Sequence, residues 1–153
     1  MSRLYYVAFD NVSVSAAQDL WELTPGLGVP IVVLGGAVTV RDDETNQQLD
    51  FTVQRRVGSF SAGSSGTPIT PVRGNTNDLM SHCAVKRNNT VRASGGTLEL
   101  FVAEGVPSQG GFQFNPTLGM APTINPGEIF LVGLENAPGA AIGLSGWIAF
   151  MEV

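Results

Sequence analysis

The sequence is short of charged side chains. Asp, Glu, Lys and Arg make up 14% of the 153 residues, against about 25% in typical soluble domains. So few charges leave much of a monomer's surface without solvated groups, whereas the centres of subunit interfaces are depleted in charge. The composition therefore predicts an oligomer, and we favour a homotrimer. The net charge is −5, and the sequence shows no basic patch of the kind that binds nucleic acid, so we expect no nucleic-acid partner.

Cysteine and histidine are almost absent. Cys83 is the only cysteine, so the chain cannot form an internal disulfide. The only histidine, His82, precedes it. Neighbours on a strand point to opposite faces, so the two cannot act together as nucleophile and base. Metal sites of the cupin type need several histidines. We therefore expect no catalytic site, no metal and no cofactor, and an enzyme on a β scaffold is the weakest alternative.

Long apolar runs are also lacking. The longest, VPIVVLGGAVTV at 29–40, has 12 residues and includes two glycines, so it is too short to span a membrane. The N-terminal MSRLYYVAFDN has no apolar stretch of the length a signal peptide needs. We expect a soluble protein that is made in a cytoplasm and has no membrane partner.

Alternation of apolar and polar residues is the strongest signal that is present. In LDFTVQRRV (49–57), one side carries an apolar series that Arg55 interrupts: Leu49, Phe51, Val53 and Val57. In TLELFVA, the same alternation places Leu98, Leu100 and Val102 towards the interior. Comparable strand-like runs, separated by Gly, Pro and Asn turn residues, lie at 3–9, 29–40, 82–87, 111–115, 128–134 and 142–153.

About eight such runs predict an all-β fold, a jelly-roll-like antiparallel β-sandwich, as a single domain over 1–153. At most one short helix is expected. SAAQDLWEL (15–23) is the candidate, because Ser15 and Gln18 fit a capping box. The alternation of Val12, Val14 and Ala16 just before it leaves an extended strand equally open.

The segment GSFSAGSSGTPITPVRGNTND, at 58–78, consists mostly of Gly, Ser, Thr, Pro and Asn. Loops of this length are uncommon in compact domains and are usually functional or disordered. Pro68 and Pro71 favour extended backbone, and Ile69 and Val72 are its sizeable aliphatic side chains. The segment therefore predicts an arm that lies along a partner, with Arg73 at the rim; a solvated surface loop is the alternative.

Three further features bear on partners. The turn RDDETN carries Asp42, Asp43 and Glu44. Ca²⁺ takes six to eight oxygens, usually from several points along a loop, so three adjacent carboxylates favour a solvated turn, and calcium stays open. The basic pairs Arg55-Arg56 and Lys86-Arg87 predict ion pairs at the rim of a subunit contact.

Trp21 and Trp147 are expected to anchor the core or an interface. Ser145, in GLSGW, lacks the glycine spacing of a nucleophile elbow, and we expect it in a core strand.

Several stretches together resemble a family of small structural proteins of tailed bacteriophages and prophages. They are YYVAFDNVSVSAAQDLWEL (5–23), VQRRVGSFSAGSSGTPITPVR (53–73), GGFQFNP (110–116), INPGEIFLVGL (124–134) and SGWIAFMEV (145–153). The resemblance covers most of the chain and consists of strand and turn signatures. It implies a jelly-roll virion protein of the decoration or cement type, located on the capsid surface and bound to the major capsid protein.

Other virion roles use similar folds. A neck or tail protein, or a receptor- or carbohydrate-binding module, remains an alternative. An exposed aromatic face, with the turn at Asp42–Glu44 as a metal site, would favour the binding module. The sequence has no coiled-coil or collagen-like segment of the kind that fibres often carry, which favours the capsid surface.

Overall fold

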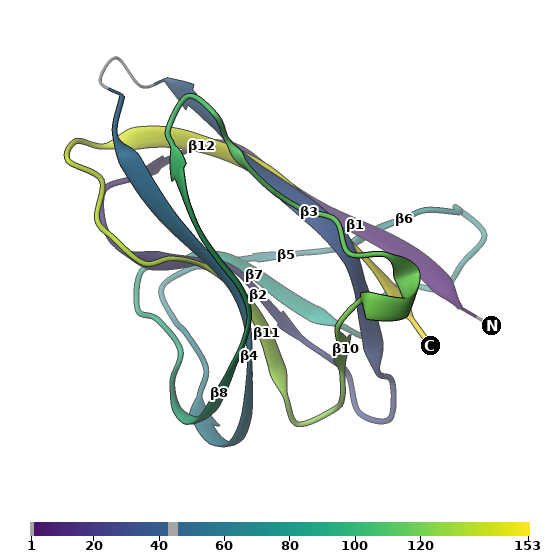
Figure 1. The fold of residues 1–153 in the computed structure, drawn as a ribbon. Helices are drawn as coiled ribbons and strands as arrows, with labels where there is room; N and C mark the ends of the chain where they lie inside the picture. Colours follow the sequence, from purple (N-terminus) through teal and green to yellow (C-terminus); the bar gives the residue numbers. More distant parts are fainter. Residues whose placement is uncertain (1, 43–45) are drawn as a thin grey trace.

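The fold is a sandwich of two antiparallel sheets (Figure 1). The computed structural model describes residues 2–42 and 46–153. Sheet A has the order β10-β3-β12-β1-β6, with β9 also paired to β3, and sheet B has the order β5-β7-β2-β11-β4-β8. The strands are β1 (Arg3–Val14), β2 (Gln18–Thr24), β3 (Ile31–Asp42), β4 (Gln48–Ser61), β5 (Thr67–Ile69), β6 (Val72–Arg73), β7 (Ala84–Asn89), β8 (Ser94–Pro107), β9 (Phe112–Phe114), β10 (Thr123–Ile124), β11 (Ile129–Leu134) and β12 (Ile142–Glu152).

The chain winds between the sheets as a jelly roll does. β1 lies in sheet A, β2 in sheet B, β3 in sheet A and β4 in sheet B; after β8 the same exchange runs through β9 and β10 to β11 and β12. Each sheet thus has four frame positions, which confirms the predicted all-β jelly-roll-like sandwich. The described residues form twelve strands rather than about eight, because β9 and β10 share one position and the short strands β5, β6 and β7 extend the edges. Within those residues the only helical element is η1 (Leu118–Met120), a single 3-10 turn.

The core lies between the two sheets and follows the period-2 pattern. Tyr5, Val7 and Phe9 of β1 point inward and are buried, and the Phe9 ring centroid lies 4.8 Å from that of Trp21 on the opposite sheet. Trp21 is fully buried, which confirms it as a core anchor. The central strands β1 and β12 pair from Arg3 with Glu152 to Val14 with Ile142.

The helix considered for residues 15–23 does not form. From Gln18 onward the chain is strand β2, paired to β11 on one side and to β7 on the other. Every residue from Gln18 to Leu23 is buried, because Trp21 and Leu23 face the core while Asp19 and Glu22 are covered by other parts of the chain. Pairing on both edges and burial on both faces override the local capping signal.

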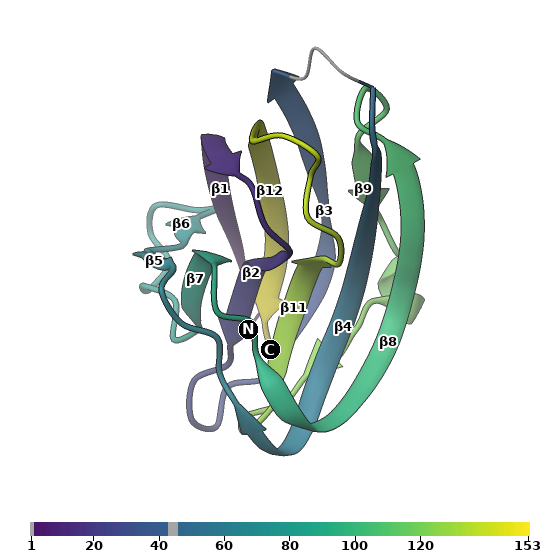
Figure 2. The ribbon, with the colours of Figure 1, turned by 90° about the vertical axis from the view of Figure 1, so that its left-hand side faces the viewer.

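The segment 58–78 is not a free arm. Residues 58–61 continue β4, β5 pairs with β7 at the end of sheet B, and β6 pairs with β1 at the end of sheet A. Figure 2 shows β5 and β6 side by side at one flank of the sandwich, so the chain crosses there from one sheet to the other. Pro71 is buried and Ile69 packs against the core. The extended backbone that the prolines favour is therefore used at sheet edges, where proline is tolerated.

Candidate interaction surfaces

The flank opposite to β5 and β6 ends in a long, unpaired strand edge. β8 runs for 14 residues and, within residues 2–42 and 46–153, pairs only with β4; the two strands form the long curved ribbon on the right of Figure 2. Leu98 is 48% exposed and Leu100 is 54% exposed. Proteins normally protect such edges, because unpaired backbone groups beside apolar side chains recruit another chain. β8 is thus the prime candidate for contact with a partner.

The prediction that Leu98 and Leu100 point inward is wrong. A register shift lies between Val53 and Gln54 of β4, where Val53 pairs with Val102 but Gln54 pairs with Leu100. The extra residue on β8, Phe101, is a bulge, and a bulge reverses the alternation of faces beyond it. Val102 keeps its inward position and packs against the core, while the two leucines are turned outward.

A groove follows the inner side of β8. Phe101, Val102 and Phe114 supply apolar surface, and Met120 lies opposite, on η1. Glu104 is the one charged residue among those that line it. The groove runs between β8 and β9, the end strands of the two sheets on this flank. This flank of the sandwich therefore combines an unpaired strand edge with a mostly apolar groove.

Arg55 lies across this open flank. Its Nε donates to Glu99 Oε2 at 2.8 Å and its Nη1 donates to the carbonyl oxygen of Thr123 at 2.9 Å. Glu128 lies 3.6 Å from Nη1, and the guanidinium carbon is 5.5 Å from the centroid of the Phe101 ring. These contacts explain why a charged residue interrupts the apolar side of β4: Arg55 links β8 of sheet B to β10 and to Glu128.

Arg56 has an intramolecular partner as well. Its Nη1 donates to the carbonyl oxygen of Gly95 at 2.8 Å. The sequence had suggested that Arg55 and Arg56 make ion pairs with another subunit; within this chain both are engaged by β8 and its neighbours. Lys86 likewise has a partner in its own chain, with its Nζ 3.4 Å from Glu22 Oε1.

The remaining predicted interface residues lie at the other flank. Pro68 and Ile69 belong to β5 and Val72 and Arg73 to β6, whereas β8 is at the far end of sheet B. Val72 is 66% exposed, but Arg73 donates to the carbonyl oxygen of Asp78 at 2.8 Å. The structure thus places Arg55 and Arg56 near one edge and residues 68–73 near the other, and does not bring them together.

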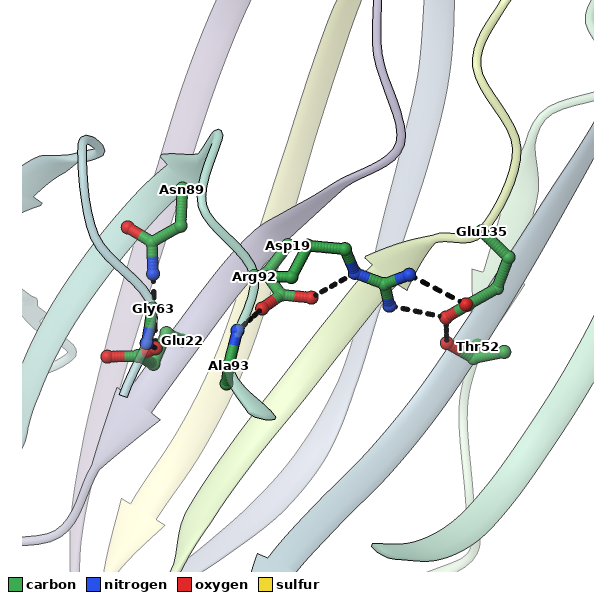
Figure 3. Close-up of polar contacts among 8 residues, drawn as sticks. All are labelled: Asp19, Glu22, Thr52, Gly63, Asn89, Arg92, Ala93 and Glu135. Atoms are coloured by element: carbon green, nitrogen blue, oxygen red, sulfur yellow. Dashed lines mark hydrogen bonds and ion pairs between the residues drawn. The ribbon is translucent and has the colours of Figure 1, made fainter. Parts of the chain in front are cut away.

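Two carboxylates on the outer face of sheet B are buried. Glu22 is 1% exposed; its Oε2 accepts hydrogen bonds from the Gly63 N–H at 2.7 Å and from Asn89 Nδ2 at 3.1 Å (Figure 3). A Cβ atom at position 63 would lie 2.9 Å from that oxygen and 2.5 Å from Asn89 Nδ2, so only glycine permits this approach. The segment after β4 is held to the sheet at this point.

Asp19 fastens the segment between β7 and β8 in the same way. It is 1% exposed and accepts hydrogen bonds from the Ala93 N–H at 2.7 Å and from Arg92 Nε at 3.0 Å. The other side of the guanidinium donates to both oxygens of Glu135, at 2.8 and 2.6 Å, and Thr52 Oγ1 donates to Glu135 Oε1 at 2.5 Å (Figure 3). Arg92 therefore joins two carboxylates from neighbouring strand regions.

These contacts shift the titration of the two acids in opposite directions. Burial raises the pKa of Asp19, although the hydrogen bonds from Ala93 and Arg92 oppose the rise. The pKa of Glu135 is lowered, chiefly because Arg92 donates hydrogen bonds to its carboxylate. Burial of a charge without partners is costly, and the hydrogen bonds of this network pair the buried Asp19 while they hold the segment at Arg92 and Ala93 against sheet B.

We expect the contribution of Glu135 to depend on pH. Since its pKa in the folded state lies below the ordinary value of 4.5, the stability it supplies is present above that value and is lost as the pH falls through the folded-state pKa. Urea denaturation of Glu135→Gln and of the unchanged chain should therefore differ most at about pH 6 and least at about pH 3. A difference in unfolding free energy that is the same at both pH values would contradict this assignment.

Cys83 and His82, the candidates for catalysis in the sequence, lie beside the end of β12. Burial raises the pKa of the Cys83 thiol to about 12, which leaves it protonated and a poor nucleophile. The His82 side chain is half exposed, with Nδ1 3.3 Å from Glu152 Oε2. Glu152 Oε1 also accepts from Ser81 Oγ at 2.7 Å and from the His82 N–H at 2.6 Å, and so holds this segment to the end of β12.

Ser145 lies in the central strand β12 with its side chain on the outer face of sheet A. Its hydroxyl donates to Asp10 Oδ1 at 2.7 Å and accepts from the Asn11 N–H at 2.9 Å.

Asp43 and Glu44 of the acidic turn lie outside the described residues, so the structure does not test whether this turn binds calcium. Across 2–42 and 46–153 there is no helix of the length and apolarity that crossing a membrane requires.

Comparison with protein-family models, with curated proteins and with solved structures finds no match to this chain.

Proposed function

We propose that this protein is a non-enzymatic structural subunit of a virion, most simply a capsid decoration or cement protein that binds the major capsid protein. The observation that carries the proposal is the open flank at β8. A strand edge of 14 residues with half-exposed Leu98 and Leu100, beside an apolar groove, is a surface that a stable isolated protein avoids. An assembly subunit needs such a surface.

A partner would add to this flank in a defined way. Extended backbone that pairs with β8 satisfies its free N–H and C=O groups, while apolar side chains enter the groove beside Phe101 and Phe114. Low charge in the sequence and the resemblance to phage virion proteins support the same function. Because the β8 and β5–β6 flanks differ, a ring of copies would join unlike surfaces, as in a homotrimer.

Charge placed on the outward side of β8 should prevent assembly without unfolding the subunit. Leu100→Lys changes a side chain that is 54% exposed, so its effect on stability should be small, about 0.5 kcal/mol or less. Sedimentation equilibrium should show that the unchanged chain is oligomeric at micromolar concentration and that the variant is monomeric. Binding to capsid shells assembled from the major capsid protein alone should fall in parallel.

Val91→Lys is the matched control. Val91 has the same exposure, 54%, but belongs to the segment before β8 rather than to its edge, and the variant should assemble normally. A monomeric unchanged chain that also fails to bind shells would refute the proposal. Binding to tails or neck complexes but not to shells would assign the subunit to another part of the virion.

A further inference from the structure

Two aromatic side chains stand exposed on the outer face of sheet A. Tyr6 of β1 is 42% exposed and Trp147 of β12 is 41% exposed. Tyr6 pairs with Ala149 and Trp147 pairs with Ala8, so the two rings are diagonal neighbours on adjacent strands and on the same face. Side chains in this relation are within contact distance of one common ligand.

Trp147 has a small residue beside it on each flanking strand, whereas Tyr6 has Ala149 on one side and Val72 of β6 on the other. Ala8 and Ala37 occupy the positions beside Trp147 on the flanking strands, and Ala149 lies between Tyr6 and Gly35. The two positions paired with Trp147 thus carry no large side chain that would cover its ring. Sheet B differs, because its outer face is covered by the chain's own crossing segments at Gly63 and Ala93.

A row of polar side chains adjoins Trp147 on the same face. Ser145, two residues before Trp147, pairs with Thr39 of β3 and donates to Asp10 Oδ1 at 2.7 Å. Arg41 Nε lies 3.8 Å from the same Asp10 oxygen, and the two side chains are 57% and 76% exposed. The row therefore offers exposed donors and acceptors that are already oriented by contacts with one another.

This pairing of exposed ring surfaces with a polar row matches the two sides of a sugar. A pyranose presents a face of C–H groups, which packs on an aromatic ring, and an edge of hydroxyl groups, which need hydrogen-bond partners. Tyr and Trp combine a large apolar body with a polar tip. The opposite charges of Asp10 and Arg41 cancel locally, and the net charge of −5 repels an anionic polymer. Both points favour a neutral ligand.

We propose that the outer face of sheet A is a binding site for a neutral oligosaccharide. Pyranose rings stack on Trp147 and Tyr6, and their hydroxyl groups bond to Asp10, Thr39 and Arg41. The site is separate from the β8 flank and does not depend on the function proposed above.

Tryptophan fluorescence offers a direct test. Trp21 is fully buried, so iodide should quench Trp147 alone, and a sugar stacked on Trp147 should protect it. The probes are cellohexaose, maltohexaose and mannohexaose, with calorimetric titration as the second measurement. At least one should bind and shield Trp147 from iodide. Trp147→Ala should reduce the affinity at least about tenfold, and Tyr6→Ala should reduce it as well.

Leu27→Ala is the control, because Leu27 is 98% exposed on the β2–β3 turn and should leave binding unchanged. Assembly of Trp147→Ala should equal that of the unchanged chain. Failure of all three hexasaccharides to bind, or binding that persists in Trp147→Ala, would overturn the proposal. Loss of assembly in Trp147→Ala without any sugar binding would overturn it too, and would assign this face to protein contact.

Discussion

Replacement of residues 61–74 by a short Gly-Ser turn should destabilise the protein severely or prevent folding. The exchange removes β5 and β6, the packing of Ile69 against the core, and the Gly63 N–H that donates to buried Glu22. Removal of a partner from a buried charge costs about 3–5 kcal/mol, a large part of the typical stability of a small domain. Urea denaturation followed by circular dichroism measures the change.

The control is an exchange of residues 75–77 for Gly-Ser residues of equal number. These three residues are exposed and lie beyond β6, so the unfolding free energy should change little. If the larger replacement also left the unfolding free energy unchanged, residues 61–74 would be a dispensable arm, as their composition had suggested, and the edge pairing described above would contribute nothing.

Arg92→Met should be the most damaging single substitution in the polar network. It removes the charge between Asp19 and Glu135 while keeping most of the side-chain volume. Of the partners that the described residues give the buried carboxylate of Asp19, it leaves the Ala93 N–H. We expect a loss of about 3 kcal/mol, at the lower end for broken buried pairs because Arg92 is partly exposed. Urea denaturation at neutral pH measures it.

Two comparisons make the result specific. Arg41→Met breaks the exposed pair with Asp10, whose side chains are 57% and 76% exposed, and should cost no more than about 0.5 kcal/mol. Adding Asp19→Asn to Arg92→Met should recover part of the loss, because a neutral amide is cheaper to bury than an unpaired carboxylate. Equal losses in Arg92→Met and Arg41→Met would show that the network does not stabilise the fold.

The frame of the fold was predictable because its strands bury one face and expose the other. β1 and the first half of β4 show this period in the sequence, and the structure follows it at Tyr5, Val7, Leu49 and Phe51. The order in which the chain alternates between the two sheets leaves no local pattern in the sequence. About eight short strands with turns between them nevertheless favour a two-sheet fold.

The sequence left β2 undecided between helix and strand because its second face is buried against polar groups from distant parts of the chain. Glu22 meets Gly63, 41 residues away, and Asp19 meets Arg92, 73 residues away. In the sequence these carboxylates look like the solvated side of a helix. Nothing near residues 18–24 indicates that glycine and arginine from later segments will cover them.

The candidate surfaces depended on a bulge and on strand pairing, which composition does not reveal. Leu98 and Leu100 would face the core if β8 were regular, and the unpaired Phe101 reverses them. Arg55 appeared to be a charge for a neighbouring subunit, yet Glu99 and Glu128 belong to its own chain. The diagonal placement of Tyr6 and Trp147 follows from the register of β1 with β12, which links residues about 140 positions apart.

The pairing of β1 with β12 also governs how the protein yields to a pulling force. Arg3 is opposite Glu152, and Figure 1 marks both ends of the chain at the same end of the sandwich. Tension applied between the ends therefore loads one pair of backbone hydrogen bonds at a time, and β1 and β12 separate in the unzipping geometry, starting from the chain ends. Glu152 belongs to the first residue pair that separates, so its hydrogen bonds with Ser81 and His82 break before the core residues of the two strands are exposed.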